Sequence, residues 1–466
     1  MKAVYKVSKR SGSDCYLVGG SIRDLLCRVE VCDYDFALFS EADSFAAMVA
    51  GELGAHFFRL GADKGCSRIV FSENGEKKEA DFSPLKSGCI EEDLKRRDFT
   101  VNAIACSVWS LFEEGGLNLI DPLGGQGDLE EGRLRLVSEE CIDEDPLRIL
   151  RGFRIASNLS LAMDEGFLSL AGKKKGLLSK VSAERVRAEI FKMFSSEDTL
   201  PYLEEMLSLG VLQEVMPELS EWKDIDQGSH HDFKLLDHAL RSVGYIDRII
   251  SDACPEVSAH ETKLRVHLDE MLEDGISRRS MAKLAALLHD SGKPSCLKME
   301  SGKVSFHGHE EKGSIINKKI ASRLKVGRFA GRVLSNITRQ HMRVLHLSKL
   351  EKVTPRAMAR FIRDCGDETP EVLLLALADS WATRESRDIE HPDVESIVSS
   401  LFDLYYETDV VEESSFLKGR DVMRELGIAE GVQVGRYLDL VSEAERMGHI
   451  GSREDALEFL RNKQFS

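Results

Sequence analysis

The spacing of apolar positions divides the chain into a mixed first part and a helical remainder. Up to about residue 136, short apolar runs alternate with turn residues, and the stretch 41–54 carries the apolar repeat of a helix. Later apolar positions recur at helical spacing, including a segment after Ser182, which stands at an N-cap position. The pattern predicts strands in three places after the first apolar run: residues 56–61, 67–71 and 79–82.

The expected fold class is therefore α+β, with a small mixed-sheet head followed by all-helical domains. The last stretch, residues 416–463, predicts two amphipathic helical segments broken by glycines. A length of 466 residues is enough for about three domains, each able to bury a core.

Composition narrows the location and partners of the protein. The N-terminus lacks an apolar signal region, and no apolar run is long enough to span a membrane, so we expect a cytoplasmic protein with no membrane partner. The ten cysteines form no CxxC pair, which favours reduced thiols. A net charge of −17 means that any nucleic-acid partner needs basic residues gathered on one face.

A first chemical centre is predicted around residues 17–36. Glycines after a strand, Gly19 and Gly20, let the backbone close on a phosphate group. Asp33 and Asp35 stand two apart in a predicted strand, so their carboxylates project to one face and need a cation between them. Mg²⁺ carrying a nucleoside triphosphate suits such a pair.

Three later segments carry further polar groups. Asp81 lies on a strand that could run beside the strand of Asp33 and Asp35. The stretch that begins at Arg96 predicts a helix whose apolar face includes Phe99, Val101 and Ile104. Asp145 and Arg148, three apart, are expected on one helix face, where a carboxylate and a guanidinium can read the edge of a base.

These motifs resemble the class II tRNA nucleotidyltransferases and bacterial poly(A) polymerases of the polymerase-beta-like superfamily. The shared pattern is a GG, an RD and a DxD in residues 17–36, then RRDFTxNA and EDxxR; Cys27 and Cys32 replace the usual glycine and lysine of the connector. The resemblance implies that Asp33 and Asp35 hold Mg²⁺ and that Asp81 helps activate the attacking hydroxyl. It implies nucleotide binding by Gly19, Gly20, Arg23, Arg97, Asn102, Asp145, Arg148, Arg151 and Arg154.

A second centre is predicted from about residue 227 onward. Histidines and acids follow one another in the order H, HD, H, H, D, which suits a divalent transition metal such as Ni²⁺ or Mn²⁺. The set resembles an HD-domain phosphohydrolase centre, in which a metal-bound hydroxide attacks a phosphoester. We call it the HD centre: His238, His289, Asp290 and Asp379 for one metal, with His309 and His341 allowing a second. His230, His231, His307 and His346 are assigned to its surroundings or the surface.

The domain boundaries expected from these motifs are 1–136 for the nucleotidyltransferase head, 137–225 for a helical neck and body that binds the base and RNA, 226–385 for the HD domain and 386–466 for a helical tail. The expected function is addition of nucleotides from CTP or ATP to the 3′ end of tRNA. In relatives that build the whole CCA end, the resemblance places a longer loop between the positions of Asp81 and Arg97. The short connection here therefore favours CC addition.

Other functions remain open at this point. An A-adding enzyme, a full CCA-adding enzyme and a poly(A) polymerase share the head, and synthesis of a homopolymer from ATP on any RNA would distinguish the last. A phosphohydrolase whose head only binds RNA is disfavoured by the intact Asp33 and Asp35. A non-catalytic RNA-binding protein is disfavoured because both centres keep their acids.

Overall fold

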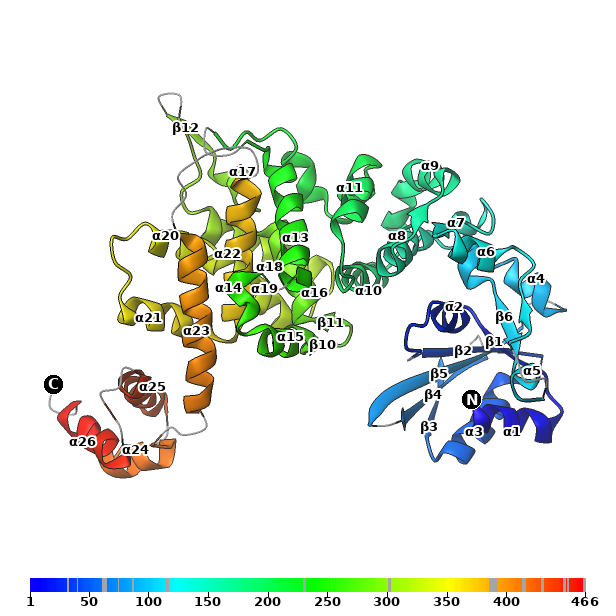
Figure 1. Ribbon diagram of the computed structural model, residues 1–466, viewed down its shortest axis with the longest axis horizontal. Helices are drawn as coiled ribbons and strands as arrows, with labels where there is room; N and C mark the ends of the chain where they lie inside the picture. The colour runs from blue at the N-terminus through cyan, green and yellow to red at the C-terminus, as the bar shows by residue number, and fades with distance from the viewer. Residues whose placement is uncertain are drawn as a thin grey trace. The chain divides into compact units, whose positions relative to one another are not determined.

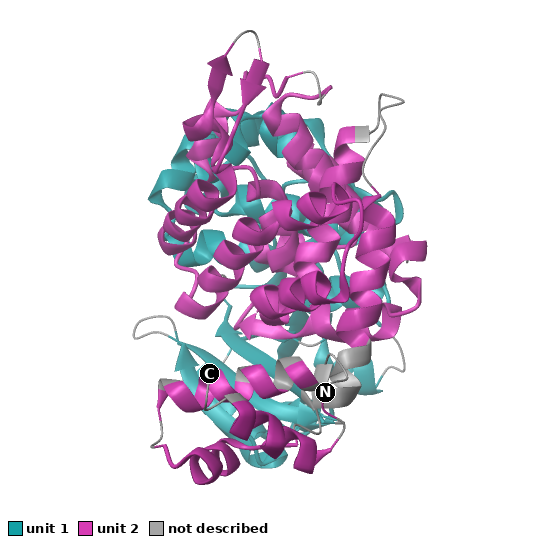
Figure 2. Ribbon diagram, turned by 90° about the vertical axis from the view of Figure 1, so that its left-hand side faces the viewer, with its two compact units in different colours: residues 1–189, 205–215 teal, residues 190–204, 216–466 magenta. Residues whose placement is uncertain are grey.

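The computed structural model divides into two compact units, which Figure 2 shows in teal and magenta. Unit 1 comprises residues 1–189 and 205–215, and unit 2 comprises residues 190–204 and 216–466. The finer division at residues 136, 225 and 385 stays a prediction. The structure describes residues 1–31, 33–39, 41–60, 65–73, 75–85, 88–113, 117–228, 232–252, 254–300, 303–384, 393–412, 416–428, 431–446, 450 and 452–463.

Unit 1 contains a seven-stranded mixed sheet, which confirms the predicted head architecture (Figure 1). The strand order is β3-β4-β5-β2-β1-β6-β7, and β2 and β5 run parallel while the other neighbours are antiparallel. The strands are β1 (Cys15–Val18), β2 (Asp33–Leu38), β3 (His56–Leu60), β4 (Cys66–Glu73), β5 (Glu76–Pro84), β6 (Ala105–Ser107) and β7 (Leu119–Ile120).

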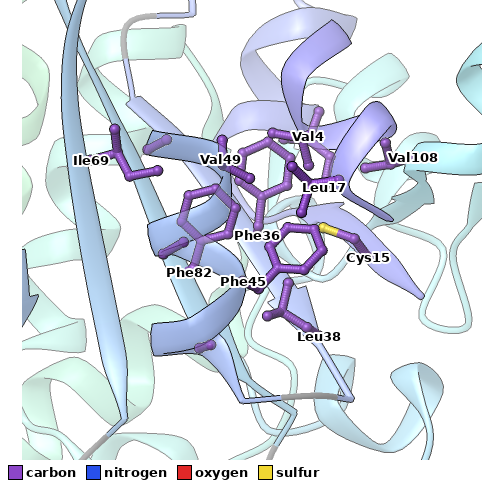
Figure 3. Packing of buried hydrophobic residues seen from close by; sticks show 14 of the residues in the cluster. Val4, Cys15, Leu17, Phe36, Leu38, Phe45, Val49, Ile69, Phe82 and Val108 are labelled. Atoms are coloured by element: carbon purple, nitrogen blue, oxygen red, sulfur yellow. The ribbon is translucent and has the colours of Figure 1, made fainter. Parts of the chain in front are cut away.

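Alternation along β2 and β5 separates the core from the chemistry. Phe36 and Phe82 point to one face, where their rings stack with centroids 4.9 Å apart and pack against Phe45 of α3 (Ala42–Leu53), as Figure 3 shows. The helix α1 (Lys2–Ser11) adds Val4 and Val7 to this core. Because side chains alternate with period two, the odd-numbered acids of β2 and β5 lie on the opposite face.

The helix predicted to begin at Arg96 is absent from the described stretch 88–113. The expected helix with Phe99, Val101 and Ile104 on its apolar face is not formed: a single 3-10 turn, η1 (Thr100–Asn102), leads directly into β6. Phe99 forms an isolated bridge with Leu136, and β6 pairs with β1, so strand contacts on both sides of the turn leave no room for a longer helix.

The Asp145–Arg148 segment corrects a second prediction. Asp145 does not share a helix with Arg148: α7 (Cys141–Glu144) ends before it, and α8 (Arg148–Leu159) begins three residues later. Asp145 has extended backbone angles of φ −147° and ψ 97°. The reason is Pro146, whose ring disfavours the helical region for the residue before it.

The other elements of unit 1 are short helices, which connect strands of the head sheet or follow it, and a two-stranded ladder. They are α2 (Gly20–Leu26), α4 (Ile90–Leu94), α5 (Val108–Glu113), α6 (Gly125–Glu130), β8 (Arg133–Leu134), β9 (Ala162–Met163), α9 (Glu165–Lys174), η2 (Lys175–Lys180) and α12 (Val211–Val215). The chain passes between the units within α10 (Ala183–Phe194), within α11 (Leu200–Ser208) and directly after α12.

Unit 2 is a helical assembly with two short hairpins (Figure 1). Its buried centre is formed by α13 (Leu235–Asp252), α16 (Arg278–Leu288), α19 (Arg328–Gln340) and α22 (Thr369–Arg384). Around it lie η3 (Pro217–Glu221), α14 (Pro255–Ser258), α15 (Glu261–Asp269), β10 (Met271–Glu273), β11 (Ile276–Ser277), α17 (Lys293–Cys296), β12 (Lys298–Glu300), β13 (Lys303–Ser305), α18 (His309–Arg323), α20 (Met342–Ser348), α21 (Pro355–Cys365), η4 (Gly366–Glu368) and α23 (Val394–Glu412).

The described residues of the last stretch, 416–463, form three helices rather than the predicted two: α24 (Gly419–Leu426), α25 (Val432–Arg446) and α26 (Arg453–Lys463). Gly427, with φ of +64°, ends α24, whereas Gly435 lies inside α25 and does not break it. The three helices share a core of their own that includes Leu417, Val441 and Leu460. Among the described residues, no helix is long and apolar enough to cross a membrane.

Candidate functional sites: a carboxylate face and an HD centre

The glycine turn after β1 is closely packed against charged side chains. Gly19 has φ +69° and ψ −136°, a conformation that a residue with a Cβ rarely adopts. A Cβ there would lie 2.8 Å from an Arg97 guanidinium nitrogen and 3.5 Å from Asp35 Oδ2. The main chain of the turn, a basic group and an acid of the DxD pair therefore meet at one point.

The strand pairing places four acids on one face of the sheet. In the parallel register of β2 and β5, Asp33 stands opposite Glu79 and Asp35 opposite Asp81, and we call these four residues the carboxylate face. Ser21 joins the first turn of α2 to this strand, because its hydroxyl donates to Asp33 O at 3.0 Å and accepts from Asp35 N at 2.8 Å. The predicted neighbourhood of Asp81 and the DxD strand is confirmed, and Glu79 is an addition that the prediction missed.

Crowding of acids changes the protonation of Asp35. Burial raises the pKa of its carboxyl to about 6, Arg97 opposes the rise, and the charges of Asp81 and Asp33 add to it. A divalent cation among these oxygens would relieve the repulsion, so the donor set fits Mg²⁺, which prefers carboxylate oxygens.

Arg68 on β4 binds two members of the carboxylate face. Its Nε donates to Asp81 Oδ1 and one terminal nitrogen donates to Asp81 Oδ2, both at 2.8 Å. Its other terminal nitrogen contacts Glu79. Antiparallel pairing places Arg68 directly opposite Asp81. These hydrogen bonds raise the pKa of the guanidinium further, so its charge is permanent.

A chain of charged hydrogen bonds extends from the glycine turn to the helices that follow the sheet. Arg23 donates to Asn102 Oδ1 at 2.6 Å, and Asn102 donates to Asp98 Oδ1 at 3.0 Å. Asp98 is buried, which opposes its ionisation, but Arg151 and Asn102 outweigh that effect and lower its pKa. Glu189 then bridges Arg151 and Arg154. Arg23, Asn102, Arg151 and Arg154 are therefore brought together, with Asp98 and Glu189 as linking acids that the prediction did not include.

The side chains of Asp145 and Arg148 have separate partners, while the main-chain N–H of Arg148 donates to Asp145 O at 3.0 Å. Arg185 of α10 donates to Asp145 Oδ2 at 2.6 Å. Arg148 donates to the main-chain oxygens of Cys141 at 3.0 Å and Arg96 at 3.1 Å. Arg148 is thus tied to the end of the connection that follows β5.

The first group of the HD centre gathers three buried ligands and one acid at the edge of a cavity. His238 on α13, His289 and Asp290 present ligand atoms within 4.8 Å of one another. Asp379 Oδ1 on α22 accepts a hydrogen bond from His238 Nε2 at 2.8 Å. Nε2 of His289 is fully buried, lies 3.0 Å from Asp290 Oδ2 and makes no well-formed hydrogen bond, which fits a nitrogen placed to bind a metal.

The second group shares Asp290 with the first. Asp290, His309 and His341 also place ligand atoms within 4.8 Å, and the Nε2 atoms of the two histidines are 3.2 Å apart. Burial disfavours the charge of Asp290, but His289 and Lys293 outweigh it and hold the pKa of that carboxyl well below its usual range. One ionised carboxylate between two histidine groups suits a site for one or two divalent ions.

Three of the histidines are oriented by the main chain. The Nδ1 atoms of His289, His309 and His341 lie 2.8, 3.0 and 2.6 Å from carbonyl oxygens three residues earlier, so Nδ1 carries the hydrogen and Nε2 faces the centre. Burial, with repulsion from His289, lowers the pKa of His341 to about 3. Burial likewise lowers the pKa of His238 despite Asp379. His238 and His341 therefore favour the neutral form, which is the form that binds metal. Burial opposes the charge of His289, but Asp290 and Asp379 outweigh it and raise the pKa of His289 to about 10.

A cavity of about 650 Å³ opens onto the HD centre. Lys293, which the prediction missed, is buried beside it, with Nζ 2.6 Å from Asp290 Oδ2 and 2.6 Å from Gln227 Oε1. The histidines assigned to the surroundings, His307 and His346, are exposed and line the cavity. The other two, His230 and His231, lie outside the described residues, as does Cys32.

Comparison with known proteins identifies the family. Residues 15–135 match the family described as "Poly A polymerase head domain", residues 161–223 match "Probable RNA and SrmB- binding site of polymerase A", and residues 263–384 match "HD domain". The A-adding tRNA nucleotidyltransferase of Deinococcus radiodurans is 30% identical over 96% of this chain and 94% of its own length. The chain belongs to the tRNA nucleotidyltransferases of the CCA-adding type.

Other members of the family have different nucleotide specificities. CC-adding tRNA nucleotidyltransferases of Geobacter sulfurreducens and Thermus thermophilus are 28% and 29% identical, over 99% and 96% of this chain and 95% and 93% of their own lengths. A Thermotoga maritima CCA-adding enzyme solved with tRNA has the same fold, with a TM-score of 0.60, 20% identity and coverage of 99% of this chain and 93% of that one. Nucleotidyltransferase and HD domains both imply the use of divalent metals.

Proposed function

We propose that this nucleotidyltransferase adds two C residues to the 3′ end of tRNA from CTP, with catalysis on the carboxylate face. The observation that carries the proposal is the glycine turn packed against Arg97 and Asp35 in a chain of this family. That contact provides a guanidinium donor for a triphosphate directly beside the acids that would hold its cation.

Three acids of the carboxylate face and the basic residues and glycines beside it are assigned different tasks in this proposal. Asp33 and Asp35 would hold Mg²⁺, which when bound offsets charge on the phosphates and on the attacking and leaving oxygens. Gly19, Gly20 and Arg23 hold the triphosphate, and Arg97 donates to its oxygens. Asp81 accepts the proton of the tRNA 3′ hydroxyl.

Base selection is assigned to Asp145 and Arg148. Cytosine and adenine both present an exocyclic amine beside a ring acceptor, and they differ in size. Arg148 is anchored on the Arg96 carbonyl at the end of the short connection, which supports a reading pair that stays in one place. A pair fixed for C would leave the terminal A to a separate protein.

A second candidate is addition of the terminal A alone. It is favoured by the 30% identity to an A-adding enzyme over nearly the whole chain. A dedicated A-adding enzyme also needs no shift of the reading pair, so a fixed Arg148 is compatible with either specificity.

The HD centre is proposed to hydrolyse phosphoesters independently of the head. The two histidine groups around Asp290 would hold the metal, such as Ni²⁺ or Mn²⁺, which supplies an activated water when bound. Lys293 and the cavity beside it are suited to an anionic substrate, because a buried ammonium attracts phosphate oxygens.

One assay separates the nucleotide specificities. Purified protein is given tRNA that ends at the discriminator base and tRNA that ends in CC, with each labelled triphosphate alone. We expect CMP on the first tRNA and nothing on the second. AMP on the CC-ending tRNA without CMP on the other would assign A addition, both together would assign full CCA synthesis, and long A tracts on any RNA would assign a poly(A) polymerase.

A further inference from the structure

Arg68 is placed by the sheet itself rather than by a flexible loop. It lies on β4, one strand away from β5, and the antiparallel register brings its Cα opposite that of Asp81. Its neighbour Ile69 is buried in the head core, so alternation directs Arg68 to the opposite face, with Asp81 and Glu79. The strand register therefore places Arg68 on the same side of the sheet as the carboxylate face.

The contact between Arg68 and Asp81 is a forked one. Nε bonds Oδ1 and a terminal nitrogen bonds Oδ2, both at 2.8 Å, which fixes the plane of the carboxylate as well as its position. A carboxylate offers about four lone-pair directions, so two remain for a proton or a metal. Asp81 can thus be held by Arg68 and still take part in chemistry.

Glu79 completes the arrangement from the other side. It contacts the remaining terminal nitrogen of Arg68 and also accepts from Lys77 Nζ at 2.9 Å. Four acids on two adjacent strands repel one another. Arg68 offsets that repulsion at the β5 pair, while Asp33 and Asp35 on β2 are left for a cation.

We propose that Arg68 is a positioning residue for nucleotidyl transfer: it holds the Asp81 carboxylate in the plane from which Asp81 meets the reacting hydroxyl. The inference rests on the proposed function of the head. It assigns Arg68 no contact with substrate, so all of its effect must pass through Asp81.

The test measures kcat, KM for CTP and Mg²⁺ dependence for Arg68→Ala and Arg68→Lys. Loss of a residue that orients a functional group typically costs about 10- to 100-fold. We expect a fall of that size in kcat for Arg68→Ala, a KM for CTP within about twofold of wild type, and an intermediate kcat for Arg68→Lys, which keeps the charge without the fork. The matched control is Arg59→Ala, an exposed arginine on β3 paired with Asp43, which should keep the wild-type rate.

A double variant tests the route of the effect. If Arg68 acts only through Asp81, adding Arg68→Ala to Asp81→Asn lowers kcat by less than about twofold beyond the single Asp81→Asn variant. Fully multiplied losses, a wild-type rate in Arg68→Ala, or a loss that falls on KM alone would overturn the inference. Asp33→Ala is assayed in parallel: wild-type addition there would overturn the proposed head function and this inference with it, whereas an inactive Asp33→Ala beside a fully active Arg68→Ala overturns only the inference.

Discussion

The acids of the head and the side chains of the HD centre differ in how far they are exposed to solvent. In the head, Asp81 keeps 31% of its side chain exposed and Asp33 is exposed, and the neighbouring cations are arginines. In the HD centre, His289 and Asp290 are 0% and 1% exposed. A strand face collects acids simply by alternation and leaves them open to a large substrate, whereas packed helices can hold imidazoles rigidly and admit only what fits a cavity.

Removal of one acid of the DxD pair should have the largest effect on the head. Asp33→Ala or Asp35→Ala should lower nucleotide addition at least about a thousandfold, because the several kcal/mol of charge stabilisation supplied by the cation are lost. Asp33 is exposed, so folding and tRNA binding should be nearly unchanged. Incorporation of labelled CMP and a tRNA-binding titration measure the two effects, and near wild-type addition in either variant would refute the role of the pair.

Removal of a buried ligand probes the other centre. His289→Ala should abolish phosphoester hydrolysis and lower transition-metal content more than tenfold, while nucleotide addition stays at the wild-type rate. Metal analysis of the purified protein and cleavage of a chromogenic phosphodiester with Ni²⁺ or Mn²⁺ provide the readouts. His260→Ala is the control, because His260 pairs with Asp403 on another part of unit 2. Absence of both metal and cleavage in the wild-type protein would make the centre structural.

Unit 2 also contains a buried ion pair between Lys283 and Asp247, outside the HD centre, and this pair tests the energetic cost of burying charge where no metal is expected. Lys283 Nζ lies 2.5 Å from Asp247 Oδ1 and 3.0 Å from Thr199 Oγ1. Burial raises the pKa of Asp247 and lowers that of Lys283, so desolvation outweighs the attraction within the pair. Lys283→Met should therefore lower the free energy of unfolding by about 3–5 kcal/mol, because it leaves a buried carboxylate without its cation.

Denaturant unfolding followed by circular dichroism measures this loss. The double variant Asp247→Leu/Lys283→Met should recover most of it, since no buried charge remains. A single variant within about 1 kcal/mol of wild type would show that the pair carries little of the stability of unit 2.

The smallest expected effect concerns Asp145 and its exposed partner. Arg185 is 51% exposed, and exposed ion pairs contribute about 0–1 kcal/mol. Arg185→Ala should therefore change the ratio of kcat/KM for CTP to that for ATP by at most about fivefold. Lys192→Ala, an exposed residue of the same helix, serves as the control. A change above a hundredfold would mean that Arg185 contacts the nucleotide itself.

Local pattern was sufficient to place Asp33 and Asp35 on one face of a strand and to select the histidines that gather around Asp290. A spacing of two on a strand makes Asp33 and Asp35 neighbours wherever that strand lies, and the histidines follow one another on helices with apolar faces. The same rule would have placed Glu79 on the face of Asp81, had it been applied to β5. Arg68 was beyond this reasoning, because its position opposite Asp81 depends on the register of two antiparallel strands.

The incorrect predictions came from elements that compete with helical spacing. Pro146 overrides an otherwise helical pattern and moves Asp145 out of the helix of Arg148. At Phe99, pairing with Leu136 and the start of β6 replace an amphipathic helix. In both places long-range pairing or a proline changes which groups a side chain can reach, and the spacing alone does not contain that information.

The carbonyl groups that receive the Nδ1 hydrogens of His289, His309 and His341 have a consequence for mutational tolerance. Each acceptor belongs to the main chain three residues earlier, at Ala286, Phe306 or Thr338, and a side-chain substitution there does not remove it. Ala286 and Thr338 lie in α16 and α19, and Phe306 lies between β13 and α18, so main-chain groups orient all three imidazoles. Saturation mutagenesis of unit 2 should find that substitutions of the HD-centre residues are not tolerated. At Ala286 only the space around the side chain should limit the substitutions that are accepted. The sequence of the surrounding helices can therefore change while the imidazoles keep their direction.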